Sequence, residues 1–362
     1  MFNKGGNDLT EIWKQGTVIY FAPVQKQYFQ KWEYYQVDLD MLNACFSNVI
    51  VCHSNWSFIK TIIFSRVSAV YGWWWHQAVI PVILARILKV PVYITGAVHM
   101  YDESGSPDFF SKGILFRLAC RISWRLSSKN FFISESQYRQ VCSHEVVKNA
   151  CVLRSSLSES FDIEKLKFSL ARKNSSSRIK MLTIVWMTKD QLKRKSVYET
   201  LEAIKRLVKD GRKNFVWTIA GGSADGTKGL AYAIENLGLA DYIKLQVDLS
   251  NEQKIELYNT SDLYIQPSYY EGFGNAVLEA MSYGLVPIVS RNTAQPEVIG
   301  DSGFIVEEIN SEFIAKAIGE YLNLSSKQYS ERRELVYKTI SERHLFDYRL
   351  DQFSKMISKE EL

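Results

Sequence analysis

Two glutamates with seven residues between them, Glu271 and Glu279, are the side chains in this sequence best placed to hold one ligand together. Glu271 precedes an expected helix and Glu279 lies well inside it, so both carboxylates can face the same molecule and hydrogen-bond its hydroxyl groups. At about 1.5 Å per helical residue, their separation is on the order of 12 Å. This exceeds the roughly 5 to 9.5 Å between the carboxylates of a glycoside hydrolase. The spacing therefore argues against hydrolysis and suits the two ends of an extended nucleotide sugar.

The residues between the glutamates predict an anion site. An apolar strand ends in a tight turn with two glycines, and a helix then begins. Glycine lets the backbone approach a ligand closely, and the first helical amides are unpaired at the positive end of the helix dipole. These groups suit a diphosphate. The residues expected at the phosphates are Gly272, Phe273, Gly274, Asn275, Ala276 and Val277, of which the last three supply the free amides.

The elements that must position this segment alternate along the chain as strand and helix. Expected strands cover residues 17–22, 49–52, the region near 69, 92–95, 131–134, 180–185, 215–220, 243–246, 263–266 and 286–290, and long helices are expected at 78–88 and 113–127. Such alternation predicts parallel, doubly wound sheets. Because 362 residues exceed one ordinary core, we expect an α/β fold with two Rossmann-like domains facing a cleft.

A change of composition marks the expected domain boundary. The stretch 171–178 is rich in serine and basic residues and is typical of a linker. We therefore expect an N-terminal domain over residues 1–170 and a C-terminal domain over residues 179–340. An amphipathic stretch at 345–357 predicts a last helix, within residues 341–362, that crosses back to the N-terminal domain.

Composition places the chain among ordinary globular proteins, with 46% hydrophobic and 23% charged residues. The five cysteines include no C-x-x-C pair, and the N-terminus lacks the basic start and apolar run of a secretory signal, so we expect a cytoplasmic protein. The net charge of +5 is uneven, because residues 1–178 carry 21 Lys and Arg against 13 Asp and Glu. The N-terminal half is therefore expected to meet an anionic partner.

Four cations recur at helical spacing in this basic half: Arg117, Arg121, Arg125 and Lys129. Apolar residues follow three of them at the same spacing, which predicts a helix with a basic stripe beside an apolar face. One interpretation is a patch that docks on the anionic inner face of a membrane to reach a lipid-linked acceptor. The other is the solvated outer helix of a Rossmann-like domain. No nucleic-acid partner is expected, because no recognised binding motif accompanies the modest charge excess.

The segment around the two glutamates resembles the signature of family 4 glycosyltransferases, in which two glutamates bracket a Gly-Phe-Gly turn. The sequence Ile-Ala-Gly-Gly ending at Gly222 is similar to that family's glycine turn, and the similarity extends over roughly residues 180–310. The resemblance implies a GT-B fold, a retaining transfer from a nucleoside-diphosphate sugar, and donor contacts from Gly221 and Gly222. It also implies that Glu271 lies beside the transferred sugar and Glu279 at the ribose.

The same resemblance assigns the cations and a histidine. Lys195 matches the lysine that the family provides to the donor phosphates, although the glycine usual after it is Ser196 here. The usual arginine is missing, and either Lys189 or Arg194 is the expected substitute. His99, at the end of an expected strand, matches a histidine beside the donor sugar and lies where open α/β sheets bind ligands. The glycine-rich loop that commonly follows the first strand is absent, which leaves the acceptor side undefined.

We therefore expect a hexosyltransferase-type enzyme that moves a sugar from a nucleoside-diphosphate sugar to a hydroxyl of a glycan or a lipid-linked glycan, as in surface polysaccharide or glycolipid assembly. Glu271, His99 and Lys195 are the expected catalytic residues. No Asp-x-Asp cluster stands in the second half, so no metal and no further cofactor are expected. Two other interpretations remain open: a nucleotide-sugar epimerase or a sugar phosphorylase on the same fold, and a non-catalytic module that binds sugar or nucleic acid.

Overall fold

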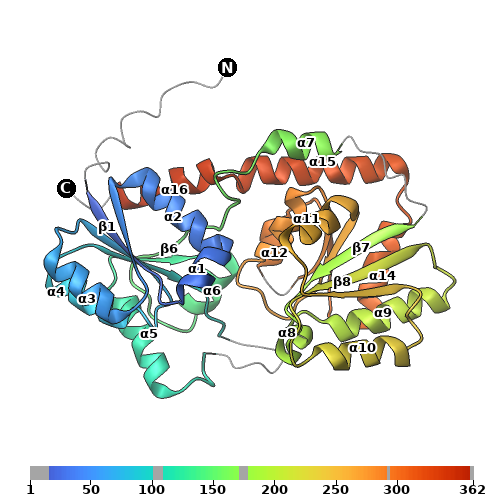
Figure 1. Ribbon diagram of the computed structural model, residues 1–362, viewed down its shortest axis with the longest axis horizontal. Helices are drawn as coiled ribbons and strands as arrows, with labels where there is room; N and C mark the ends of the chain where they lie inside the picture. Colours follow the sequence, from blue (N-terminus) through green and yellow to red (C-terminus); the bar gives the residue numbers. More distant parts are fainter. Residues whose placement is uncertain (1–15, 101–108, 171–177, 292–293, 359–362) are drawn as a thin grey trace. The chain divides into compact units, whose positions relative to one another are not determined.

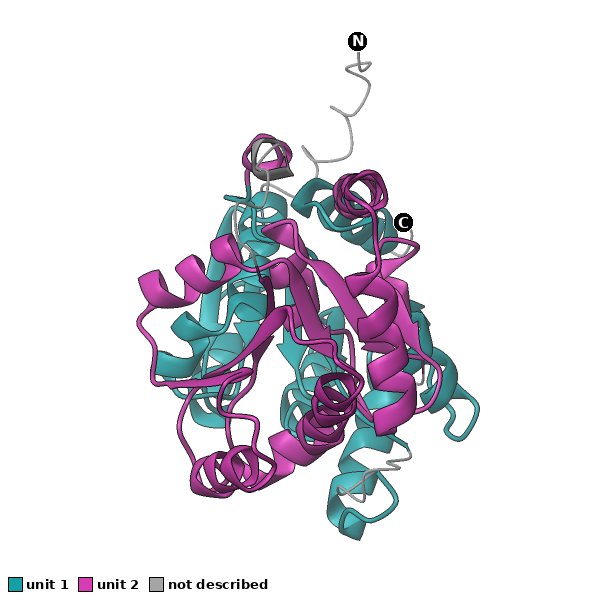
Figure 2. Cartoon of the chain, turned by 90° about the vertical axis from the view of Figure 1, so that its right-hand side faces the viewer, with its two compact units in different colours: residues 1–101, 107–161, 343–362 teal, residues 102–106, 162–342 magenta. Residues whose placement is uncertain are grey.

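The computed structural model describes residues 16–100, 109–170, 178–291 and 294–358 (Figure 1). The chain divides into two compact units, which Figure 2 shows in different colours. The first consists of residues 1–101, 107–161 and 343–362, and the second consists of residues 102–106 and 162–342. The linker expected at 171–178 lies outside the described residues, apart from Arg178.

The first unit is built on a six-stranded parallel sheet in the order β2-β1-β3-β4-β5-β6. Its strands are β1 (Thr17–Phe21), β2 (Asn48–Cys52), β3 (Ala69–Trp73), β4 (Val92–Gly96), β5 (Lys129–Phe132) and β6 (Ala150–Val152). Its helices are α1 (Lys26–Lys31), α2 (Glu33–Cys45), α3 (Asn55–Phe64), α4 (Val79–Ile87), α5 (Ile114–Leu126), α6 (Glu135–Cys142) and α16 (Phe346–Ser358). Helices cover both faces of the sheet, so strands such as β3 and β4 are buried along their whole length.

The second unit repeats this architecture with a different strand order. Its parallel sheet runs β12-β11-β10-β7-β8-β9. The strands are β7 (Ile179–Ile184), β8 (Phe215–Gly221), β9 (Ile243–Val247), β10 (Leu263–Gln266), β11 (Val286–Ser290) and β12 (Phe304–Val306). The helices are α7 (Ile163–Leu170), α8 (Lys189–Arg194), α9 (Val197–Lys209), α10 (Thr227–Asn236), α11 (Asn251–Thr260), α12 (Asn275–Ser282), α13 (Gln295–Ile299), α14 (Ser311–Leu322) and α15 (Ser326–Arg343).

The two parallel sheets confirm the α/β fold that the alternation of elements predicts. Every expected strand range overlaps an observed strand, and the helix expected at 113–127 is α5. Two strands of three residues each, β6 and β12, are not predicted, because so short a run gives no periodicity to recognise.

The last helix of the chain packs on the sheet of the first unit. α16 contacts α2, and Phe353 lies against the rings of Tyr71, Tyr93 and Phe131, with centroid distances of 5.8, 6.5 and 5.7 Å. These rings all face the same side of the sheet. The final described helix therefore supplies part of the core of the unit that begins the chain.

A buried ion pair joins α16 to α2. The guanidinium of Arg349 donates to Asp38 Oδ1 at 2.5 Å and to the carbonyl oxygen of Leu153 at 3.0 Å. Asp38 Oδ2 accepts from the Tyr71 hydroxyl and from Trp73 Nε1, both at 2.8 Å. Both charged side chains are almost completely buried. The pair is hydrogen-bonded on both sides, which is the condition under which a buried charge is tolerated.

Candidate functional site

The strand order of the second unit reverses between β7 and β10. Those two strands are neighbours, and the sheet then continues through β8 on one side and β11 on the other. Open α/β sheets bind ligands outside the carboxyl ends of their strands at such a point. The chain leaves β7 toward α8 and Lys195, and it leaves β10 toward Glu271. The topology therefore brings together two segments that are distant in the sequence.

Glu271 is held by neighbours from both segments. Its Oε1 accepts hydrogen bonds from Gln266 Nε2 at 3.0 Å and from Ser268 Oγ at 3.4 Å, and Arg194 Nη1 lies 3.1 Å from it. Arg194 is fixed in turn, because the same Nη1 donates to the carbonyl oxygen of Tyr270 at 2.7 Å. The carboxylate is thus preorganised by a charge-assisted contact before any ligand arrives.

The two candidates for the missing family arginine differ in position. Arg194, at the end of α8, contacts Glu271. Lys189, at the start of α8, is exposed, and its backbone amide donates to Asp225 Oδ1 at 3.1 Å. The geometry therefore favours Arg194 as the cation at the Glu271 carboxylate.

Lys195 is a buried cation at the carboxyl end of β7. Its Nζ donates to Gln266 Oε1 at 2.8 Å and to the carbonyl oxygen of Ile184 at 3.3 Å. Burial is the main cause that lowers the pKa of this ammonium to about 8; the charge of Glu271 opposes the shift, and the charge of Arg194 adds to it. A lysine with this pKa is charged at neutral pH and loses its proton in mildly basic solution.

Gln266 connects these groups and is not among the residues that the sequence singles out. This fully buried side chain donates to Glu271 from Nε2, and its Oε1 accepts from Lys195 and, at 3.0 Å, from the hydroxyl of Tyr264. The two contacts of its amide oxygen with donors fix which way the amide points. A polar residue at the last position of an apolar, buried strand is the signal that indicates it.

The glycine turn takes the expected place at the start of α12, with one correction. Gly274 is the N-cap residue and adopts φ 111°, which glycine tolerates and side-chain-bearing residues rarely adopt. The amide of Val277 is not free, because it donates to the carbonyl oxygen of Gly274 at 2.9 Å. In the described part of the chain, the amides of Asn275 and Ala276 donate to no acceptor. The expected anion site therefore has two free helical amides instead of three.

The second glycine turn ends β8. Gly221 adopts φ 149°, and a Cβ added to it would lie 1.9 Å from the carbonyl oxygen of Val185. Only glycine fits there, since the chain that leaves β7 passes directly over it. Gly222 is less confined, because a Cβ on it would lie 3.5 Å from the nearest atom, in the ring of Trp186.

Glu279 lies on α12 and forms a second charged group. Its Oε1 is 2.5 Å from Lys254 Nζ, and its Oε2 accepts from the Tyr258 hydroxyl at 3.0 Å. The ring of Tyr258 stacks on that of Tyr283 with centroids 5.0 Å apart. Lys254 and Tyr258 come from α11, and neither is predicted from the sequence, because a helical position carries no signal of a partner on another helix.

His99 belongs to the first unit, whereas the other expected catalytic residues, Glu271 and Lys195, belong to the second. It lies three residues past β4, at the carboxyl edge of that sheet. Its side chain is half-buried, and its carbonyl oxygen accepts from the amide of Phe109 at 2.8 Å.

The basic stripe is shorter than the helical spacing predicts. α5 ends at Leu126, and Lys129 begins β5, so only three of the four cations lie on the helix. The chain leaves the helix there because the amide of Ser128 donates to the carbonyl oxygen of Val92 at 2.8 Å and joins the sheet. Arg121 is paired with Glu145, with Nη2 2.5 Å from Oε1.

Ser196 occupies a position where the chain needs a left-handed residue. Its φ is 51°, a conformation that costs an L-residue roughly 1 to 2 kcal/mol. Within the described residues its hydroxyl is buried without a hydrogen-bond partner. We expect Ser196→Gly to raise the free energy of unfolding by about 1 kcal/mol in urea titration, after the chain entropy of glycine is subtracted. Ser196→Ala, which removes the hydroxyl but keeps the Cβ, should gain less, and a loss of stability in both variants would contradict this account.

Residues 172–340 match the family model described as Glycosyl transferases group 1. The matched residues include Glu271, Glu279, Arg194 and Lys195, together with both glycine turns. The match covers most of the second unit and none of the first.

Curated relatives are similar to parts of the chain. The O-antigen chain mannosyltransferase B of Escherichia coli is 29% identical over 143 residues, which are 40% of this chain and 36% of that protein. The GDP-mannose:cellobiosyl-diphosphopolyprenol alpha-mannosyltransferase of Xanthomonas campestris is 37% identical over 98 residues, which are 26% of this chain and 25% of that protein. The chain therefore matches well under half the length of these two relatives.

Solved structures are similar over nearly the whole chain. The structure of Anabaena HepE in complex with UDP and glucose covers 95% of this chain and all of its own, with a TM-score of 0.69 and 14% sequence identity. At this identity the likeness concerns the fold. The chain therefore has the two-domain GT-B fold, and the matched residues 172–340 lie in its second Rossmann-like unit.

Proposed function

We propose that this chain is a family 4 glycosyltransferase that moves a sugar from a nucleoside-diphosphate sugar to an acceptor hydroxyl and retains the configuration of the anomeric carbon. The observation that carries the proposal is the cluster of Glu271, Arg194, Lys195 and Gln266 at the point of strand reversal, inside the matched domain. It stands beside a helix start with two free amides. This combination offers a carboxylate for sugar hydroxyls and positive groups for phosphates.

The chemical step places charge on the departing diphosphate. The bond between the anomeric carbon and the phosphate oxygen breaks, the acceptor oxygen bonds to the same face of that carbon, and the acceptor proton passes to the departing phosphate. The ammonium of Lys195, the guanidinium of Arg194 and the amides at the start of α12 stabilise the growing negative charge from fixed positions. Glu271 hydrogen-bonds the transferred sugar, and Glu279 binds the ribose hydroxyls. His99 is the further residue that the family resemblance assigns to the donor sugar.

The donor is proposed from the chemistry of the relatives. Both curated relatives are named as mannosyltransferases and one of them is named for GDP-mannose, whereas Anabaena HepE was solved with UDP and glucose. GDP-mannose and UDP-glucose are therefore the two donors to compare. The proposed acceptor is a glycan or lipid-linked glycan in surface polysaccharide or glycolipid assembly, and the reaction is proposed to need neither a metal nor a further cofactor.

The proposal is tested by thermal unfolding of the purified protein with GDP, UDP, ADP or CMP, in magnesium and in EDTA. A nucleotide present at about 100 times its dissociation constant stabilises a protein by roughly 2.7 kcal/mol. We expect one diphosphate to stabilise this protein equally with and without magnesium, and Glu279→Ala to abolish the effect. The matched control is Glu307→Ala, because Glu307 is an exposed carboxylate paired with Arg291 in the same unit.

Each outcome of this measurement has one meaning. Stabilisation by a single diphosphate supports the donor site and names the base. The absence of any nucleotide response would overturn it and favour a non-catalytic binding module. If a nucleotide stabilises the protein, and a separate assay with the sugar donor shows conversion of the donor without transfer to any glycan acceptor, an epimerase would be favoured.

The lowered pKa of Lys195 predicts a pH dependence. The ammonium must be charged to stabilise the diphosphate, so kcat/KM should fall with one proton as the pH rises through about 8. Lys195→Arg keeps the charge and should remove this basic limb from the profile. A limb that persists unchanged in Lys195→Arg would show that another group titrates. Stability should follow the opposite trend: the unfolded lysine, with a pKa of 10.5, binds more protons between pH 8 and 10.5, so folding becomes more favourable across that window.

Peripheral association with an anionic membrane is the proposed route to a lipid-linked acceptor. None of the described helices has the length and apolar character needed to cross a bilayer. Arg117 and Arg125 of the basic stripe remain on α5, and Lys129 lies just beyond it. These cations would attract anionic headgroups, each with an energy of about 1 kcal/mol near the surface.

A further inference from the structure

Three neighbouring helices of the first unit turn apolar side chains outward. α4 contacts both α3 and α5 (Figure 1). On α3 the exposed side chains are Trp56, Lys60, Ile63 and Phe64, and Phe64 is 84% exposed. Their spacing of four and then three or four residues places them on one side of the helix, opposite buried Phe58. The outer face of α3 therefore carries three large apolar side chains and one lysine.

α4 and α5 repeat this pattern. The exposed apolar residues of α4 are Ile80, Ile83 and Ile87, at helical spacing, with exposed Arg86 beside them and Leu88 after them. Soluble helices normally carry polar side chains on the face away from the core. An outward apolar stripe on one helix is unremarkable in a protein, but three adjacent helices with such stripes form one continuous surface.

The outer face of α5 is apolar at its start and basic further along. Leu115 is 78% exposed, Ile114 and Leu118 are exposed beside it, and Arg125 is exposed near the end of the helix. The apolar stripe and the cations therefore share one side of this helix.

The charged side chains of the three helices all have the same sign. Residues 41–100 and 109–134, which contain all three helices, include nine Lys and Arg and no Asp or Glu. The nine are Lys60, Arg66, Arg86, Lys89, Lys112, Arg117, Arg121, Arg125 and Lys129. Arg121 is paired with the carboxylate of Glu145. A water-exposed surface usually carries both acidic and basic side chains. Basic side chains alone around apolar ones therefore indicate an anionic, amphipathic partner.

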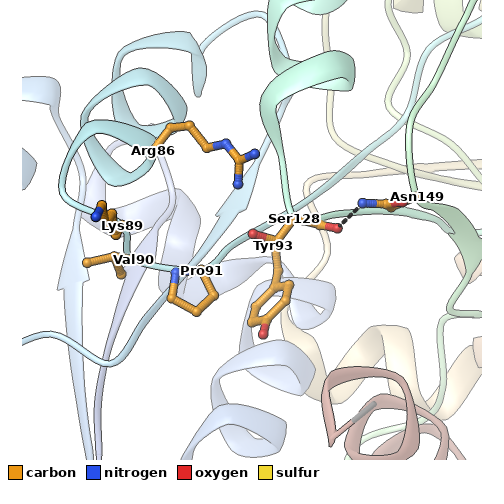
Figure 3. Close-up of a pocket in the computed structure, with 7 residues that line it drawn as sticks. All are labelled: Arg86, Lys89, Val90, Pro91, Tyr93, Ser128 and Asn149. Atoms are coloured by element: carbon orange, nitrogen blue, oxygen red, sulfur yellow. Dashed lines mark hydrogen bonds between the residues drawn. The ribbon is translucent and has the colours of Figure 1, made fainter. Parts of the chain in front are cut away.

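A pocket of about 560 Å³ lies at the end of α4, where the chain enters β4 (Figure 3). Arg86 and Lys89 line it on one side, and Ser128 and Asn149 line it on the other. Both cations are exposed and directly neighbour the exposed apolar residues at the end of α4. The pocket thus offers a phosphate group two positive charges within one helical turn of the apolar surface.

We propose that the outer faces of α3, α4 and α5 dock on an anionic phospholipid membrane. Side chains such as Phe64, Ile87 and Leu115 enter the boundary between headgroups and acyl chains, and Arg86 and Lys89 bind headgroup phosphates. This inference extends the membrane association proposed above and does not depend on the donor chemistry. The membrane contact is then made mainly by the apolar surface of three helices, and the basic side chains, including those of α5, lie around it.

The test is sedimentation of the purified full chain with vesicles. We expect binding to vesicles of phosphatidylglycerol and phosphatidylcholine in equal amounts, and at least tenfold weaker binding to pure phosphatidylcholine. Phe64→Gln with Leu115→Gln should weaken binding to the anionic vesicles by more than tenfold at low salt. Arg86→Gln with Lys89→Gln should weaken it severalfold, and most of that difference should vanish in 0.5 M salt, where charges are screened.

Matched controls come from the second unit. Tyr232→Gln removes an exposed apolar side chain, and Lys327→Gln with Lys338→Gln removes two exposed lysines. Neither control should change vesicle binding, and nucleotide stabilisation should be the same in all variants, so failure here is distinguishable from failure of the donor site. Equal binding by the Phe64→Gln, Leu115→Gln variant and the wild type would overturn the proposal. The proposal would also be overturned if the wild type failed to bind vesicles and formed a dimer that this variant does not form. A second copy of the chain would then cover the surface.

Discussion

Glu271→Gln is expected to lower kcat/KM for sugar transfer by about 100- to 1000-fold, the range found when one preorganised electrostatic group is removed from an active site. Glutamine keeps the size of the side chain but removes the charge that Arg194 contacts at 3.1 Å. The sugar hydroxyls lose a charged acceptor, and the guanidinium, although still held by the carbonyl oxygen of Tyr270, loses its counter-charge. The measurement is the initial rate of transfer from the donor that the thermal-shift experiment selects.

Two comparisons give this result its meaning. Glu307→Gln removes a carboxylate that is also paired with an arginine, but on the surface, and should leave the rate unchanged. Glu271→Gln should still be stabilised by the nucleoside diphosphate, because Glu279 and the glycine turns remain. A variant that keeps normal transfer would exclude Glu271 from the reaction.

Asp38→Ala is expected to destabilise the first unit by about 3 to 5 kcal/mol, the usual cost of leaving one member of a buried ion pair alone. The substitution strips Arg349 of its carboxylate, and it also leaves the Tyr71 hydroxyl and the Trp73 indole without their acceptor. Urea unfolding followed by tryptophan fluorescence suits the measurement, since seven of the nine tryptophans belong to this unit.

The control for this effect lies on the same helix. Asp351→Ala breaks an exposed pair with Lys355 on α16 and should cost no more than about 0.5 kcal/mol. Asp38→Leu combined with Arg349→Met removes both charges and should recover part of the stability, since no charge is left buried alone, although the Tyr71 hydroxyl and the Trp73 indole still lack their acceptor. A double variant as unstable as Asp38→Ala would mean that the shape of the network matters more than its charge.

The fold was largely predictable because it depends on local patterns. Each strand except β6 and β12 is an apolar run long enough to recognise, and the helices between them have their own periodicity. The order of the strands was not predictable. It depends on β7 pairing with β10 across some 80 residues of chain, which is a matter of tertiary packing.

The candidate site was predictable where its residues are contiguous. Glu271, Gly274 and Glu279 share one segment, and the structure places them in the loop and helix that the segment predicts. The prediction that the amide of Val277 is free was wrong, because this amide donates to the carbonyl oxygen of Gly274 in the first turn of α12. Gln266 was missed because its importance lies in its contacts with Lys195, Tyr264 and Glu271, and the sequence shows only that a polar residue ends an apolar strand.

The place of α16 has a consequence for how the protein is made. A ribosome completes residues 16–152, with all six strands of the first sheet, long before it reaches residues 346–358. Until then Tyr71, Tyr93 and Phe131 lack the cover that Phe353 supplies, and Asp38 lacks its cation. The unit that is synthesised first is therefore the last to finish folding, and its exposed aromatic face must be protected from aggregation while the whole second unit emerges.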